Sequence, residues 1–338
     1  MKSKASSRPF LRPLGCGVSM LLALVLGSCS SPAPMPPPQA RQLPPQQQPG
    51  EYDRGPAPRQ FGINGPSNIL NGAPLGRANS VLLIDANSGQ ELAARNADMP
   101  RSVASTQKLV TALVVIAAGD LDRNVVVQPD DVRVQPTVLG VRPGEVYTRR
   151  NLLTAMLVKS TNDVAQVLAR DNAGSLPAFA DRMNSMARSL GCTNSRFVNP
   201  HGLDTGGQYS TARDMAHIAM AAYHNPVIRD ITRRHGYTFV FNSGKATHLE
   251  NTNKILNHMP ECNGMKTGYT TTAGRCLVSS AGNGNRDLIA IQLGTETRYI
   301  WEDGEALMRW GFDQGGGNRG RYYGSAAPEM SDDSLSFR

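Results

Sequence analysis

The sequence lacks the features that mark three common classes of protein. Its N-terminal apolar run, Val18–Leu26, is too short to span a membrane, which takes about twenty residues. None of its six His residues has partners at metal-ligand spacing, which argues against a metal site. Basic residues form no stripe beyond two short groups around Arg149 and Arg233, so nucleic-acid binding has little support.

Acidic residues are absent from the first 28 positions. Four basic residues precede the apolar run there, namely Lys2, Lys4, Arg8 and Arg12. This order is typical of a secretory signal, so we expect residues 1–28 to be a signal peptide of an exported protein. The formal charge of +8 is therefore misleading, because the rest of the chain carries 31 Lys and Arg against 27 Asp and Glu, or +4.

The signal segment ends in Leu26–Cys29, which resembles a bacterial lipobox. In that interpretation Cys29 is lipidated and anchors the mature chain to a bacterial membrane, facing the periplasm or cell wall. Ser30 after the cysteine favours outer-membrane sorting in bacteria that use that rule. The alternative is an ordinary signal peptide cleaved near Ser28, with Cys29 incidental.

Apolar residues are sparse in two further segments. Residues 30–76 carry twelve prolines with many Gln, Gly and Arg, a composition that cannot bury enough apolar surface to fold. We therefore predict a disordered tether at 29–76, a folded domain at 77–312 and a disordered tail at 313–338. The folded part fits one domain of mixed type.

A first candidate for chemistry is the tetrad Ser105–Lys108. The run from Ser105 to Ala118 has helical periodicity, and positions i and i+3 share a helix face, so Ser105 and Lys108 can meet. A serine becomes a nucleophile when a base takes its proton, and a lysine can be that base if burial or nearby positive charge lowers its pKa. Taken alone, the tetrad also fits a helix-capping Ser and a surface Lys.

Two further short motifs follow in the chain. Ser160–Asn162 lies between two helical segments, where Ser160 could relay a proton and Asn162 could hold a peptide group, although either could simply cap a helix. Lys266–Gly268 precedes a Thr-rich turn and a second strand, so its Lys, Thr and close-packing Gly could bind a carboxylate. An edge strand protected by a Lys is the alternative. The three motifs in this order supply every part of an acyl-transfer site.

The chain resembles a D-alanyl-D-alanine carboxypeptidase of the low-molecular-mass penicillin-binding type, from about Ser80 to about Phe312. The segments that carry the resemblance are Arg101–Lys108, Leu157–Asp163, Asn199–Leu203, Ser210–Asp214 and Gly264–Thr270.

The resemblance implies a role for each motif residue. Ser105 would be the acylated nucleophile and Lys108 its base, with an oxyanion hole formed by the N–H groups of Ser105 and Tyr269. The other implied roles are proton transfer and amide binding by Ser160 and Asn162, carboxylate binding by Lys266 and Thr267, close backbone approach at Gly268, and a further carboxylate contact from Arg298. The implied partners are peptidoglycan peptides and inhibitory β-lactams, with no cofactor and no metal.

Two other polar residues, His201 and Asp214, are interpreted as structural and not as catalytic. His201 lies in consecutive turns and has no second ligand nearby, so we interpret it as structural. Asp214, three residues after Thr211, fits the start of a helix.

Cysteines are few, and Cys192, Cys262 and Cys276 remain after the signal segment, in an oxidising compartment. In a hairpin centred near Thr271, Cys276 faces Lys266, and Cys262 lies about 13 Å further along the strand. We therefore expect no Cys262–Cys276 disulfide, unless Cys262 lies in a loop that folds back.

The order of elements predicts an α+β fold of the β-lactamase and transpeptidase type. Strands are expected at 81–86 and 91–94, flanking a turn at 87–90, and again near 237–241, 264–266, 275–281 and 287–293. Residues 151–223 are expected to be mostly helical, and a helix at 301–310 closes the domain. This order predicts an antiparallel sheet covered by helices beside an all-helical subdomain, with the site between them.

We consider four functions for a chain with these three motifs. The first is a D,D-carboxypeptidase that removes the terminal D-Ala from peptidoglycan pentapeptides, and the second is a D,D-endopeptidase that cleaves cross-links. The third is a non-catalytic peptidoglycan-binding lipoprotein, which the complete motifs argue against. A class A β-lactamase needs a deacylating Glu between the second and third motifs, and no Glu occurs between Glu145 and Glu250.

Overall fold

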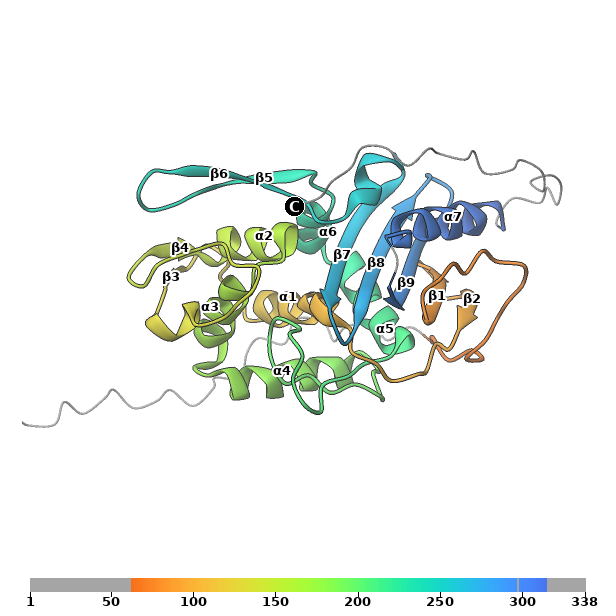
Figure 1. Cartoon of the computed structure of the whole chain (residues 1–338), viewed down its shortest axis with the longest axis horizontal. Coiled ribbons are helices and arrows are strands. Elements are labelled where there is room, and N and C mark those ends of the chain that lie inside the picture. The colour runs from red at the N-terminus through yellow and green to blue at the C-terminus, as the bar shows by residue number, and fades with distance from the viewer. Residues whose placement is uncertain (1–61, 297, 315–338) are drawn as a thin grey trace, which may run out of the picture. The chain divides into compact units, whose positions relative to one another are not determined.

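The computed structural model describes residues 62–296 and 298–314 (Figure 1). The predicted signal segment, Cys29 and nearly all of the predicted tail therefore lie outside the described residues. Among the helices of the described part, none combines the length and the apolar content needed to cross a membrane.

A five-stranded antiparallel sheet lies in the middle of the domain, with the strand order β2-β1-β9-β8-β7. Its strands are β1 (Ser80–Asp85), β2 (Glu91–Arg95), β7 (Cys262–Thr270), β8 (Gly274–Gly282) and β9 (Asp287–Thr295). The first strand of the domain pairs with its last, so the sheet joins the two ends of the folded chain. Strand β7 lies at one edge of the sheet, so its outer side has no strand partner in the part of the chain that the structure describes.

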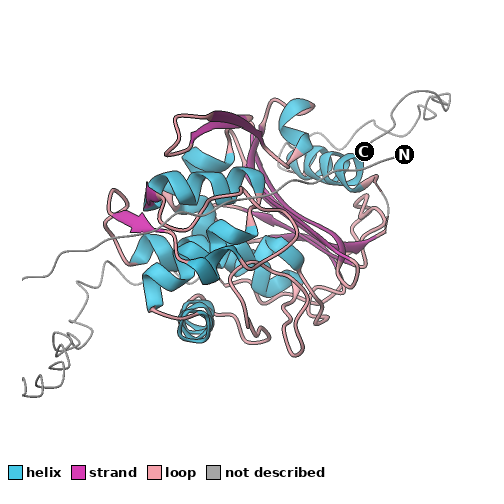
Figure 2. Ribbon diagram, turned by 60° about the vertical axis from the view of Figure 1, so that its left-hand side comes forward, coloured by secondary structure: helices cyan, strands magenta, loops and turns pink. Residues whose placement is uncertain are grey.

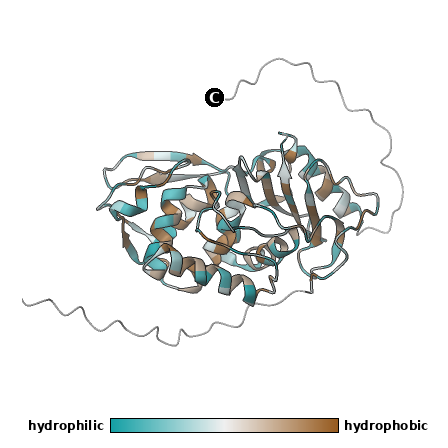
Figure 3. Cartoon of the chain, turned by 60° about the horizontal axis from the view of Figure 1, so that its bottom comes forward, coloured by the Kyte–Doolittle hydropathy of each residue, from teal (hydrophilic) through white to brown (hydrophobic). Residues whose placement is uncertain are grey.

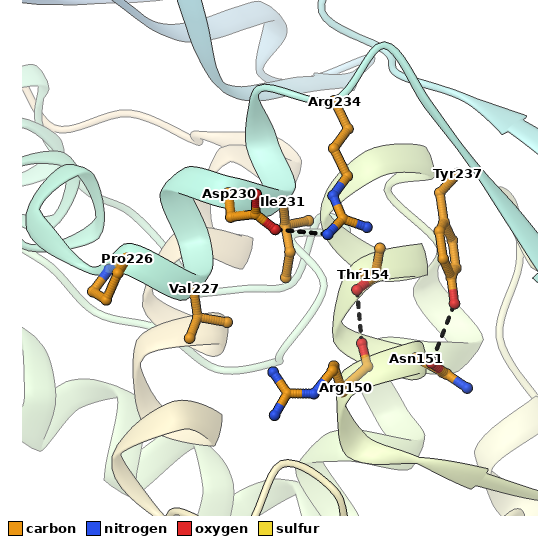
Figure 4. A pocket seen from close by; sticks show the side chains of 9 residues that line it. All are labelled: Arg150, Asn151, Thr154, Pro226, Val227, Asp230, Ile231, Arg234 and Tyr237. Atoms are coloured by element: carbon orange, nitrogen blue, oxygen red, sulfur yellow. Dashed lines mark hydrogen bonds and ion pairs between the residues drawn. The ribbon is translucent and has the colours of Figure 1, made fainter.

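Both faces of the sheet are covered, as Figure 2 shows, because successive strand residues point to opposite sides and both sides are apolar. On one face, Leu83 and Leu277 pack with helix α7 (Ile300–Asp313). On the other, Leu82 and Ile291 join the core that includes α1 (Lys108–Ala117) and α5 (Ala212–His224). Apolar residues accordingly concentrate along the central strands in Figure 3.

A helical region is inserted between β2 and β7. It contains η1 (Ala104–Gln107), α1, α2 (Arg149–Lys159), α3 (Asn162–Ala173), α4 (Leu176–Ser189), α5 and α6 (Pro226–Thr232), with short turns η2 (Pro129–Val132) and η3 (Lys254–Asn257). Two antiparallel pairs of strands also lie in this part of the chain. They are β3 (Asn124–Val126) with β4 (Val146–Thr148) and β5 (Gly236–Val240) with β6 (Ala246–Glu250). The predicted α+β class and the helix-covered antiparallel sheet are confirmed. The region beside the sheet is not all helical as predicted, because β3 and β4 pair between α1 and α2.

The N-terminal boundary of the folded domain was predicted too late in the chain. Residues 62–76, which we had assigned to the tether, belong to the domain. Ile63 is fully buried, and Ile69 exchanges two main-chain hydrogen bonds with Ala94, at 2.8 and 2.7 Å. The Gly65 N–H donates to Glu91, and the Gly65 carbonyl accepts from Arg213. The prediction failed because ten of the twelve prolines lie before residue 62, so the average composition concealed a short ordered segment.

The predicted register of the β7–β8 hairpin was wrong by two residues. Thr270 pairs with Gly274, which places Cys276 opposite Gly268 and Val278 opposite Lys266. Cys262 pairs with Ala281, about 17 Å along β8 from Cys276. The two thiols are thus further apart than we expected, and both are buried and free.

Candidate active site

The nucleophile candidate, Ser105, lies in a 3-10 turn at the start of α1. Residues i and i+3 eclipse one another in a 3-10 turn, so Ser105 and Lys108 are brought side by side. The Lys108 Nζ lies 2.8 Å from the Ser105 Oγ. The predicted helix from Ser105 therefore exists, with its first turn wound more tightly than an α-helix.

Lys108 is fully buried and has two further partners. Its Nζ lies 2.7 Å from the Asn162 Oδ1 and 2.7 Å from the His201 carbonyl oxygen. The Asn162 amide is oriented by its nitrogen, which donates to the Pro136 carbonyl at 2.6 Å, so that its oxygen faces Lys108. Both of these partners are acceptors only.

This partner set can be satisfied by a neutral amine. A neutral lysine has two N–H donors and one lone pair, so it can donate to Asn162 and His201 and accept from Ser105 once the Ser105 hydroxyl, which in this structure donates to the His201 carbonyl, turns to Lys108. Burial and the positive charge of Lys266 hold the pKa of Lys108 well below its ordinary value of 10.5, while the Asp163 carboxylate partly opposes this shift. The lowered pKa favours the neutral amine, which is the form that a general base requires.

Ser160 and Asn162 lie where the sequence predicted, in the tight connection between α2 and α3. Ser160 ends α2 in the left-handed conformation, with φ of 67°, and Asn162 is the first residue of α3. The Ser160 Oγ accepts a hydrogen bond of 2.8 Å from the Lys266 Nζ. The second motif thus touches both of the other motifs, through Asn162 to Lys108 and through Ser160 to Lys266.

The third motif lies on the edge strand β7. Lys266 is almost fully buried, and burial lowers its pKa to about 7. A Cβ placed on Gly268 would lie 2.8 Å from the Ser105 nitrogen and 3.0 Å from the Thr106 nitrogen. A glycine is therefore needed here, because β7 passes directly against the turn that carries the nucleophile.

The positions of Tyr269 and Arg298 do not test the roles that the sequence predicted for them. The Tyr269 side chain is exposed, and the Arg275 guanidinium lies over its ring, 5.5 Å from the centroid. Its predicted contribution is a backbone N–H, one residue beyond the close contact between Gly268 and Ser105. Arg298 is exposed, and its guanidinium lies over the ring of Tyr299, 5.6 Å from the centroid.

The loop Asn199–Leu203 supplies a group that the sequence did not reveal. The His201 carbonyl accepts from both Lys108 and Ser105, the latter at 3.1 Å. The His201 ring is structural: its Nδ1 accepts from the Leu203 N–H, and burial together with Lys108 lowers the pKa of His201 to about 3. Gly202, with φ of 91°, allows the loop to reach the main chain of Ala104.

Two other contacts went unpredicted. Asp163 accepts from the Leu139 and Gly140 N–H groups, at 2.9 and 2.8 Å, which ties a neighbouring loop to the second motif. Thr252 lies 2.7 Å, oxygen to oxygen, from the hydroxyl of Thr267. As for metals, no group of three or more His, Cys, Asp or Glu side chains in the described residues could hold an ion.

The chain is similar to known proteins of one family. A model of the D-alanyl-D-alanine carboxypeptidase family matches residues 70–297. The carboxypeptidase DacB2 of Mycobacterium tuberculosis is 36% identical over 245 residues, which cover 71% of this chain and 84% of that protein. DacC of Escherichia coli is 36% identical over 255 residues, covering 71% of this chain but only 62% of that longer protein.

A solved structure is similar over the whole domain. The crystal structure of a D-alanyl-D-alanine carboxypeptidase from Mycobacterium tuberculosis aligns with a TM-score of 0.67 and 32% identity, covering 82% of this chain and all of that one.

Proposed function

The chain belongs to the D-alanyl-D-alanine carboxypeptidase family, and from its active-site geometry we propose that it removes the terminal D-alanine of peptidoglycan pentapeptides through an acyl-enzyme on Ser105. Its membership of this family makes it a serine-type hydrolase. The observation that carries the proposed roles is the environment of Lys108, which is buried, bonded to the Ser105 hydroxyl and otherwise surrounded by acceptors.

In the proposed acylation, Lys108 takes the Ser105 proton while the Ser105 oxygen attacks the carbonyl carbon of the D-Ala–D-Ala bond. Negative charge on the carbonyl oxygen would be stabilised by the N–H groups of Ser105 and Tyr269. The C–N bond then breaks, and the leaving amine receives the proton of Lys108 by way of Ser160, which returns Lys108 to its neutral form. Water then attacks the ester carbonyl and gives a proton to Lys108, and Lys108 passes it to the Ser105 oxygen as the ester bond breaks and the shortened peptide is released.

The terminal carboxylate of the substrate would bind beside Lys266 and Thr267. A neighbouring anion favours the charged form of a lysine, so binding would raise the pKa of Lys266 from about 7. The ammonium group would then pair with the carboxylate. A β-lactam presents a comparable carbonyl and carboxylate, so it would acylate the same serine.

Digestion of purified cell-wall peptides tests this proposal, with products weighed by mass spectrometry. We expect the pentapeptide to lose one alanine, and expect no loss with Ser105→Ala. Cleavage restricted to cross-linked dimers would favour the D,D-endopeptidase instead. If wild-type protein binds these peptides and changes neither, the hydrolase proposal is wrong and a peptidoglycan-binding role replaces it.

We also propose that the enzyme is exported and held at a bacterial membrane by a lipid on Cys29, with residues up to 61 as its tether. The support is sequence alone: a basic segment, a short apolar run and Leu26–Cys29, followed by a proline-rich stretch. An anchored tether would let the domain search the cell-wall layer.

A further inference from the structure

A short turn, Asn251–Asn253, joins the second and third motifs from outside both of them. The Thr252 N–H donates to the Val158 carbonyl at 3.2 Å, two residues before Ser160. The Asn253 side-chain nitrogen donates to the Gly264 carbonyl at 2.8 Å, two residues before Lys266. The turn therefore fixes the end of α2 relative to the edge strand β7.

Within this turn the Thr252 hydroxyl faces the Thr267 hydroxyl, with the two oxygens 2.7 Å apart. Both side chains are half-buried, so the pair borders the site without being sealed from a ligand. Each hydroxyl has one proton to donate: in this structure Thr267 donates to Thr252, and rotation of the two hydroxyls would reverse the direction. The direction of this hydrogen bond decides what Thr267 can offer to a substrate.

If Thr267 donates to Thr252, it has only lone pairs left, and these repel a carboxylate. If Thr252 donates to Thr267, the Thr267 proton is released for the ligand. A hydrogen bond to a charged group is stronger than one between two hydroxyls, so an arriving carboxylate favours the second direction. By donating, Thr252 fills a Thr267 lone pair that would otherwise face the carboxylate and fixes the direction of the Thr267 O–H group.

We infer that Thr252 is a positioning residue for recognition of the substrate's terminal carboxylate, acting through the Thr267 hydroxyl. This inference rests on the proposed function, in which Thr267 binds that carboxylate. It also defines a specificity device, because the pair favours a carboxylate over a carboxamide of the same shape.

The hydroxyl can be removed without removing the turn. The main chain of the turn is held by the Thr252 N–H and by the side chains of two asparagines, since Asn251 donates to the Thr232 carbonyl at 3.1 Å and Asn253 to Gly264. Thr252→Val keeps the shape and the N–H and deletes only the hydroxyl. Thr252→Ser keeps the hydroxyl and is the matched control.

The experiment compares two peptides ending in D-Ala–D-Ala, one with a free carboxylate and one with a terminal carboxamide. For Thr252→Val we expect KM for the carboxylate peptide to rise about two- to tenfold, the scale of one hydrogen bond between neutral groups, with kcat little changed. The carboxamide peptide should be nearly unaffected, and Thr252→Ser should restore the wild-type preference. In a Thr267→Val background, Thr252→Val should add no further effect.

Benzylpenicillin and its methyl ester provide the same comparison through acylation rates and do not require peptidase activity. If wild-type protein cleaves neither peptide but the penicillin pair shows the expected loss of preference in Thr252→Val, the proposed function fails and this inference stands. A Thr252→Val enzyme that keeps the wild-type preference overturns the inference. Equal losses on carboxylate and neutral ligands also overturn it, because they indicate a purely structural role.

Discussion

Gly268→Ala is the substitution that most directly tests how the third motif is placed against the nucleophile. Gly268 has no positive φ, so only the lack of space opposes an alanine at this position. The added Cβ would meet the Ser105 nitrogen at 2.8 Å, the Ala104 Cβ at 2.9 Å and the Thr106 nitrogen at 3.0 Å. Two of these three atoms are main chain, so no side-chain rotation relieves the contact.

The magnitude follows from the distance that the two segments must move. Ordinary contact begins at 3.4 Å, so β7 and the turn carrying Ser105 must separate by about 0.6 Å. A displacement near 1 Å in reacting groups can cost about 100-fold in rate. Overpacking typically costs about 1–3 kcal/mol of stability, which in a domain of this size lowers Tm by about 2–4 °C per kcal/mol.

We therefore expect Gly268→Ala to remain folded and to be acylated by a labelled penicillin about 10- to 100-fold more slowly than wild type. Stopped-flow acylation and thermal unfolding measure the two effects. Gly206→Ala is the control, because a Cβ at Gly206 meets nothing within 4 Å. If Gly268→Ala is acylated at the wild-type rate, the close approach does not align the site, and the reasoning is wrong.

Other expected outcomes concern the two lysines, the nucleophile and the anchor. Ser105→Ala should lose all labelling by a fluorescent penicillin in intact-mass analysis, and surviving label would remove Ser105 as nucleophile. Lys108→Arg, which keeps the charge but cannot deprotonate, should acylate at least 100-fold more slowly in pre-steady-state assays; a near-normal rate would disprove the base assignment. In wild type, kcat/KM should rise with pH as Lys108 deprotonates and fall as Lys266, with a pKa of about 7, loses its charge. Lys266→Arg should shift that falling limb to higher pH, and an unmoved limb would assign it to another group. Cys29→Ala should release the protein from the membrane fraction, and equal membrane association would exclude lipidation as the anchor.

Periodicity and turn signals predicted most of the fold because strands and helices here keep clear local patterns. The hairpin around residues 87–90 and the helix α7 were found in this way. Registers were less predictable, since the β7–β8 pairing depends on a turn at 271–273 whose length leaves no pattern in the flanking strands. Residues 62–76 were missed for a related reason: Ile63 is held by contacts with distant segments.

The residues of the three motifs could be chosen from the sequence because their side chains carry the chemistry. The His201 carbonyl could not, since every residue has one and only the fold brings this one to Lys108, 93 positions away. Thr252 carries a hydroxyl like many others, and its pairing with Thr267 exists only because a turn crosses between α2 and β7. Sequence reasoning thus chose the motif side chains that the fold brings together and missed the groups that orient them.

Two buried lysines in one site raise the question of which one carries charge. Asp163, the acidic residue whose charge acts on Lys108, directs its oxygens to the Leu139 and Gly140 N–H groups, so it compensates the lysines only in part. With both pKa values lowered, two ammonium groups at once are disfavoured. In the proposed mechanism, a substrate carboxylate beside Lys266 would stabilise positive charge on Lys266, and that charge would in turn disfavour protonation of Lys108. The substrate's own carboxylate would thereby help to keep Lys108 in the neutral form that a base requires.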